Sequence, residues 1–147
     1  MKNKFLLLLV LVLIYSCKKE QDKNTLLFTE YLQKEFKSTI PDSLHYYILI
    51  PKLACKGCCL SVLTELDTLI NNRNEKYFTL ISTNEHIITN QFKRIKLFEC
   101  DMHGKLDDLD LDIANVTVVK TKLKKVLFIK PIYIDEKKRI SEIITFE

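Results

Sequence analysis

The sequence predicts an α/β domain built on a mixed β-sheet, and two patterns support this prediction. First, an apolar strand-like run, an amphipathic helix and a second strand-like run follow one another between His45 and Thr83. A strand–helix–strand unit of this kind places its two strands parallel. Second, two β-rich segments near the C-terminus flank the charged turn Asp135–Lys138, which is typical of an antiparallel hairpin. Parallel and antiparallel pairing together make the sheet mixed.

The chain begins with a segment typical of secretion. Met1–Lys4 is short and basic, and Phe5–Tyr15 is a nearly unbroken apolar run of 11 residues, too short to span a bilayer comfortably. The run ends at Ile14–Cys17, whose sequence IYSC resembles the lipobox of bacterial lipoproteins. This resemblance implies cleavage before Cys17, lipidation of its thiol, and a location in the cell envelope. Because Lys18 rather than Asp follows, it favours the outer membrane. The alternative is an ordinary signal peptide with an incidental cysteine.

Length and charge limit the number of domains and the partners expected for the mature protein. Removal of residues 1–16 as a signal peptide leaves 131 residues, enough for one domain with a hydrophobic core. Residues 17–24 are expected to be a lipidated tether to a domain over residues 25–147. The net charge of +4 falls to +2 once Lys2 and Lys4 leave, which argues against nucleic acid as a partner. No phosphate loop or dinucleotide fingerprint is present, and no cofactor is expected.

Hydrophobic periodicity predicts the elements of the first half of the domain. Phe28, Leu32 and Phe36 share one helical face, as do Leu60, Leu63, Leu66 and Leu69 or Ile70. The expected elements are a helix over Leu26–Lys37 capped by Thr25, a strand over His45–Ile50, a helix over Lys56–Ile70 ended by Asn71–Asn74, and a strand over Tyr77–Thr83.

The second half is expected to be richer in β-structure. The predicted elements are a short helix over Asn84–Gln91, a strand over Arg94–Glu99, an extended segment over Asn115–Lys120, and hairpin strands over Val126–Ile134 and Arg139–Phe146. Leu106–Ala114 fits a helix and a strand equally well. The basic run Lys120–Lys125 is interpreted as a solvated strand edge that discourages edge pairing, with lipid headgroup contact as the alternative.

The acidic segment Asp108–Asp112 resembles the start of a calcium-binding loop. An EF-hand needs Gly at the sixth position of this loop and Glu at the twelfth. Ile113 and Val119 stand there instead. The EF-hand interpretation is therefore rejected, and a half-exposed acidic face is expected.

A cysteine pair at the junction of the first strand and the next helix carries the candidate chemistry. Cys55 and Cys58 have C-x-x-C spacing, which allows a small disulfide ring. Amides at a helix N-terminus stabilise a thiolate at the first cysteine, and the charge of Lys56 adds to this. Such a pair suits thiol–disulfide exchange. Cys59 would point about 100° away from Cys58 on a helix and is expected to be a small buried residue.

The order β–α–β, a linking region and a terminal hairpin, with C-x-x-C opening the crossover helix, resembles the thioredoxin superfamily. The chain looks closest to its membrane-anchored envelope members, over residues Leu44–Phe146. The resemblance implies a thioredoxin-like fold in which Cys55 attacks and Cys58 resolves. It also implies protein thiols or disulfides as partners, besides the membrane that holds the N-terminal lipid.

The chain departs from the family pattern at four places. Ala54 replaces the usual aromatic residue, and Gly57 stands where proline is common. The stretch Lys122–Val126, before the presumed hairpin, lacks the usual cis-proline, and no C-terminal helix is expected after the hairpin. The missing cis-proline and the extra Cys59 favour the alternative of a non-catalytic thioredoxin-like lipoprotein, whereas the placement of C-x-x-C between strand and helix favours thiol–disulfide exchange.

A metal site is the other alternative. Cys100 and His103 have C-x-x-H spacing and could join Cys55 and Cys58 in a Cys₃His zinc site. Cysteine and methionine sulfur could instead bind Cu(I). A static disulfide between Cys55 and Cys58 also suits an oxidising envelope.

Overall fold

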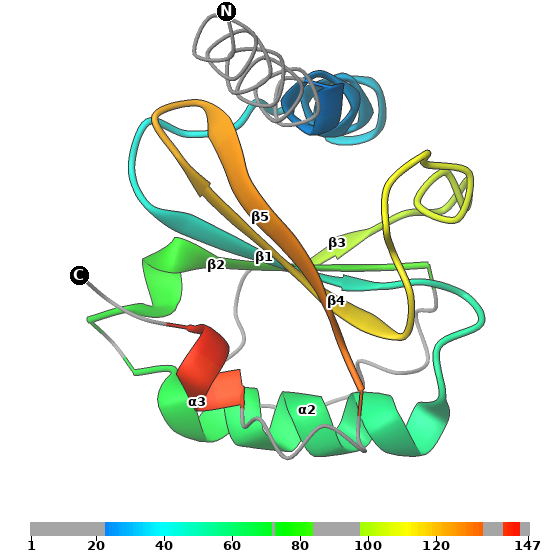
Figure 1. Ribbon diagram of the computed structural model, residues 1–147. Helices are drawn as coiled ribbons and strands as arrows, with labels where there is room; N and C mark the ends of the chain where they lie inside the picture. Colours follow the sequence, from blue (N-terminus) through cyan, green and yellow to red (C-terminus); the bar gives the residue numbers. More distant parts are fainter. Residues whose placement is uncertain (1–22, 72, 84–97, 134–139, 145–147) are drawn as a thin grey trace, which may run out of the picture.

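The computed structural model describes residues 23–71, 73–83, 98–133 and 140–144 (Figure 1). A helix covers residues 23–36. The other elements are β1 (His45–Ile50), α2 (Lys56–Leu69), a 3-10 turn (Glu75–Tyr77), β2 (Phe78–Ser82), β3 (Phe98–Cys100), β4 (Val116–Lys122), β5 (Lys125–Ile132) and α3 (Ile140–Ile143). Five strands form one sheet in the order β3-β2-β1-β4-β5.

The sheet is mixed, as predicted. β1 pairs in parallel with β2, with Tyr46 beside Phe78 and Ile50 beside Ser82, and α2 connects the two strands. β3 adds to the far side of β2, also in parallel. β4 pairs antiparallel with β1, and β5 with β4. The α/β class, the strand–helix–strand unit and its parallel pairing are therefore confirmed.

α2 covers one face of the sheet. Alternate residues of β1 point to this face, and they pack with Cys59, Val62, Leu63 and Leu66 of the helix. These four recur at intervals of three and four residues, as one buried helical stripe requires. The stripe differs from the predicted one because Leu60 and Leu69 are only half-buried. The short helix α3 packs against α2 on the same face.

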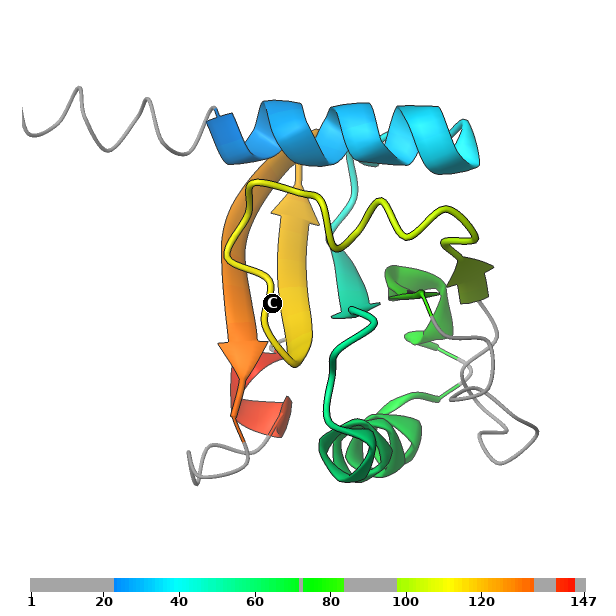
Figure 2. The ribbon, with the colours of Figure 1, turned by 90° about the vertical axis from the view of Figure 1, so that its right-hand side faces the viewer.

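The helix over residues 23–36 covers the opposite face (Figure 2). Its buried residues Phe28, Tyr31 and Leu32 pack with Tyr47 and Leu49, the β1 residues that alternate with those facing α2. Leu106, from the loop between β3 and β4, belongs to the same cluster. The domain is therefore three layers deep, with α2 and α3, the sheet, and then this helix with the β3–β4 loop.

The predicted C-terminal hairpin is wrong in its position. The hairpin strands are β4 and β5, and the turn between them lies at Leu123 and Lys124, both with positive φ. The segment expected as the second hairpin strand contains the helix α3 instead. The expectation that no helix follows the hairpin is therefore also wrong. β4 lies inside the sheet, so Lys120 and Lys122 do not guard an edge strand.

Two further expectations fall on described residues, and others do not. Thr25 lies inside the described helix, and its hydroxyl accepts the Val126 N–H rather than capping. Residues 106–114 form turns, neither a helix nor a strand. The predictions for residues 1–16, for Cys17 and for 84–97 fall outside the described residues. In the described part of the chain, no helix has the length and apolarity needed to cross a membrane.

Candidate thiol site

The cysteine pair lies at the carboxyl end of β1. After Ile50 the chain makes a turn in which the Ala54 N–H donates to the Pro51 carbonyl at 3.1 Å. The Lys52 N–H donates to the Asp107 carboxylate at 2.9 Å, which ties this turn to the β3–β4 loop. Cys55 then takes the N-cap position of α2 with extended backbone angles, φ −61° and ψ 121°. The predicted placement of Cys55 at a helix N-terminus is confirmed.

The two cysteines of the motif have different environments. Cys55 is exposed and Cys58 is half-buried, and no disulfide joins them. Neighbouring polar groups lower the pKa of Cys55. The Cys58 thiol is the largest cause, followed by the N–H groups of Cys58 and Gly57. Cys55 is therefore the thiol of the pair that ionises more readily.

Cys59 has the opposite character. Its side chain is fully buried in the cluster beneath α2, as predicted. Burial, followed by the charges of Cys58 and Cys55, raises the pKa of Cys59 to about 11. A thiol that stays protonated and cannot be reached is a packing residue and not a nucleophile.

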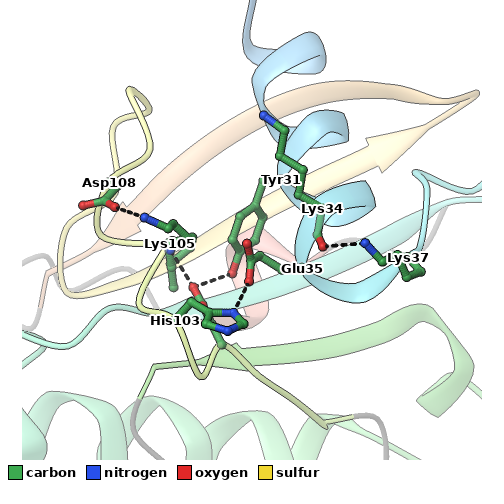
Figure 3. A network of polar contacts seen from close by, with 9 residues as sticks. Tyr31, Lys34, Glu35, Lys37, His103, Lys105 and Asp108 are labelled. Carbon is green, nitrogen blue, oxygen red and sulfur yellow. Dashed lines mark hydrogen bonds and ion pairs between the residues drawn. The ribbon is translucent and has the colours of Figure 1, made fainter.

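The proposed metal ligands are not brought together. Cys100 ends β3 beside Ser82, so β2 lies between it and β1. His103 Nδ1 lies 2.9 Å from the carboxylate of Glu35, on the helix that covers the other face (Figure 3). Across the described ranges, no three His, Cys, Asp or Glu side chains gather as a metal site would require. Cys100 and His103 therefore do not complete a site with Cys55 and Cys58.

The segment that precedes the hairpin lies next to the cysteine turn. Leu49 pairs with Thr117, so Ala114 and Asn115 lie at the carboxyl end of β1, the edge that also carries Cys55. The Thr117 hydroxyl donates to the Ala114 carbonyl at 2.9 Å, and Asn115 has φ 50°. Lys122–Val126, where a cis-proline was expected from the resemblance, contains the hairpin turn between β4 and β5. The segment that does precede β4 also contains no proline.

A buried carboxylate near this edge has no signal in the sequence. Asp101 is 1 % exposed, and its Oδ2 accepts the Tyr31 hydroxyl at 3.1 Å and the Leu106 N–H at 2.6 Å. Its Oδ1 has no partner among the described residues. Burial, followed by the charge of Asp101, raises the pKa of Tyr31 far above its usual range, so the phenol remains a donor. These contacts hold the β3–β4 loop against the helix over residues 23–36.

A pocket of about 310 Å³ opens on the helix 23–36 face near the amino ends of β1 and β2. His45 lines it, with Nε2 at 2.9 Å from the Thr79 hydroxyl. Burial lowers the pKa of His45 to about 4, so the imidazole is neutral at pH 7. The pocket therefore lies at the opposite end of the strands from Cys55, and it is not part of the thiol site.

The chain was compared with models of protein families, with curated proteins and with solved structures, and none of the three comparisons finds a match.

Proposed function

We propose that this protein is an envelope lipoprotein whose thioredoxin-like domain exchanges disulfides with other proteins through Cys55 and Cys58. The observation that carries the proposal is the placement of the pair: Cys55 is exposed at the N-cap of α2, and the half-buried Cys58 follows one helical turn later. The order of elements supports it as well. A C-x-x-C pair opens the helix of a parallel strand–helix–strand unit, and an antiparallel hairpin completes the sheet beside β1.

The exchange follows from these positions. The Cys55 thiolate attacks one sulfur of a substrate disulfide, which forms a mixed disulfide and releases the other substrate sulfur as a thiolate. Cys58 loses its proton and attacks the Cys55 sulfur, which gives the Cys55–Cys58 disulfide and frees the second substrate thiol. The substrate gains two electrons and the cysteine pair loses them. The reverse sequence oxidises a substrate dithiol.

The exposure of the two cysteines suits these roles. A substrate protein can reach Cys55, whereas Cys58 is half-buried one helical turn further on. Cys55 at the N-cap and Cys58 in the first turn of α2 have the C-x-x-C spacing that allows a small disulfide ring. Leu53 is 92 % exposed two residues before Cys55 and offers an apolar contact to a polypeptide substrate.

Trapping tests the exchange. Cys58→Ser leaves the attacking thiol without its resolving partner, so it should accumulate a mixed disulfide with a peptide disulfide substrate, detectable by mass. Cys55→Ser should form none, and Cys59→Ser should behave as wild type because that thiol is buried. Trapping through Cys59 or Cys100, or none in any variant, would contradict the proposal. One equivalent of zinc or copper bound by the reduced protein would support the metal alternative.

The lipid anchor is tested separately. The IYSC sequence at Ile14–Cys17 motivates it. Cells fed a labelled fatty acid should label the wild-type chain and not Cys17→Ala, which should also stay unprocessed. Equal label on both chains would exclude Cys17 as the acylated residue. This result would leave the thiol chemistry untouched.

A further inference from the structure

The positive charge of this protein is concentrated in one hairpin. The whole chain has a net charge of +4, and five lysines with no acidic residue fall between Val116 and Ile132. The rest of the chain therefore sums to −1. Two of these lysines, Lys120 and Lys122, belong to β4, which is paired on both sides. Protection of a sheet edge consequently does not explain them.

The apex of this hairpin combines charge with an exposed apolar side chain. Leu123 is 68 % exposed at the turn, between Lys122 and Lys124, and Lys125 follows. Among the described residues, Lys122 and Lys125 have no ion-pair partner, while Lys124 lies 3.6 Å from the Asp42 carboxylate.

The apex is also held in place. The Leu123 N–H donates to the Asp42 carbonyl at 2.9 Å, and the Lys124 N–H donates to the Pro41 carbonyl at 3.2 Å. Leu123 and Lys124 both keep positive φ, which such residues adopt uncommonly. A large apolar side chain is thus presented to solvent by a fixed turn, among cations.

The hairpin lies beside the point where the N-terminal segment enters the domain. The Val126 N–H donates to the Thr25 hydroxyl at 3.1 Å, which joins the start of β5 to the first turns of the helix over residues 23–36. Figures 1 and 2 both show the turn between β4 and β5 close to this helix. Five residues separate Lys23 from Cys17, a stretch that reaches at most about 20 Å.

We propose that the apex at Lys122–Lys125 contacts the surface of an anionic phospholipid leaflet, with Leu123 among the headgroups and the lysines on phosphates. This inference rests on the proposed lipid anchor, which holds the domain within reach of that surface. Lysines near an anionic leaflet each favour binding about fivefold, and an apolar side chain at the interface adds to it.

The contact would orient the cysteine pair. β4 runs antiparallel to β1, and Thr121 lies beside His45, so the apex is at the amino end of β1. Cys55 follows the carboxyl end of the same strand, whose six residues span about 20 Å. A domain resting on its hairpin apex therefore presents Cys55 away from the bilayer, toward soluble substrates.

Photocrosslinking of the full lipidated chain tests this orientation. The protein is reconstituted in vesicles of phosphatidylethanolamine and phosphatidylglycerol that contain a traceable phospholipid. Leu123→p-benzoylphenylalanine should crosslink to lipid. The same change at Leu53, which is 92 % exposed beside the cysteine pair, is the matched control and should not. Equal crosslinking at both positions, or none at Leu123, would overturn the proposal.

Charge variants sharpen the result. Lys122→Gln with Lys125→Gln should lower crosslinking from position 123 by roughly 25-fold, about fivefold for each lysine. Vesicles of phosphatidylcholine alone should also lower it. Lys52→Gln with Lys56→Gln, at the other end of the strands, should change crosslinking from position 123 little. If this pair lowers crosslinking as much as the Lys122 and Lys125 pair does, the contact is not local to the apex. The fatty-acid label on Cys17 separates the two hypotheses. A labelled chain without the crosslink refutes the apex contact, and an unlabelled chain refutes the anchor.

Discussion

The two faces of the sheet bury different kinds of side chain. Beneath α2 the cluster is aliphatic apart from Cys59 and the rings of Tyr46 and Phe78. Beneath the helix over residues 23–36, the apolar cluster is joined by the buried carboxylate Asp101 and lies near the buried imidazole of His45. The α2 face thus depends on close packing, whereas the other face also depends on the hydrogen bonds that Asp101 Oδ2 accepts.

This difference explains how the thiol site is supported. Cys55 and Cys58 are carried by the helix on the apolar face, where Cys59 and the three aliphatic residues of the stripe fix α2 on the sheet. The polar face holds the β3–β4 loop in place, and this loop in turn accepts the Lys52 N–H through Asp107. Substitutions on the two faces should therefore affect the stability of the protein in different ways.

The largest effect is expected on the apolar face. Leu66 is 1 % exposed under α2, so Leu66→Ala should lower the free energy of unfolding by about 2–5 kcal/mol in urea. Leu53→Ala is the control, because Leu53 is exposed and should change stability by less than about 0.5 kcal/mol. A comparably small loss for Leu66→Ala would mean that α2 does not pack as described.

Removal of the buried carboxylate should cost nearly as much. Asp101→Ala leaves the Tyr31 hydroxyl and the Leu106 N–H without their acceptor, at about 1–3 kcal/mol for a buried unpaired group. Asp101→Asn keeps an acceptor oxygen and should recover more than half of the loss in urea melts. If alanine and asparagine behave alike, these hydrogen bonds do not stabilise the loop.

The polar face should also make stability depend on pH. The pKa of His45 falls to about 4 in the folded protein, against about 6.5 in an unfolded chain. Between pH 4 and pH 6.5 the unfolded state binds more protons than the folded state. The contribution of neutral His45 to the free energy of unfolding is therefore fully present above about pH 6.5 and is lost as the pH falls toward 4. The cost at pH 5 is on the order of 2 kcal/mol. His45→Gln should remove this part of the difference between pH 7 and pH 5; an unchanged difference would mean that His45 is accessible to solvent.

Local patterns were enough to predict the first half of the fold. β1 was predicted with its observed bounds because the apolar run Tyr46–Ile50 follows a turn-forming segment and ends at Pro51. α2 was predicted to within one residue because Asn71 and the residues after it end the helical pattern. The pairing of β1 with β2 then follows from the crossover.

The hairpin could not be located in the same way. Its turn uses Leu123 and Lys124 at positive φ, and neither residue type signals such a turn. The charged stretch at residues 135–138 is a stronger local turn signal, and the hairpin turn was therefore predicted there. In the site, Cys55 and Cys58 were recognised from their spacing. Asp101 was not, because its partner Tyr31 lies 70 residues away and only the packed fold brings them together.

The most direct test of the central claim is the rate at which each cysteine of the reduced protein is alkylated as the pH is varied, resolved by mass spectrometry. The exposed position of Cys55 at the helix N-terminus and its lowered pKa predict that Cys55 reacts first, with a midpoint below the free-thiol value of about 8.5. Cys59 should stay unmodified until well above that pH, since its pKa is raised to about 11. A Cys55 midpoint at or above 8.5, or a Cys59 that reacts as fast as Cys55, would contradict the assignment of Cys55 as the nucleophile.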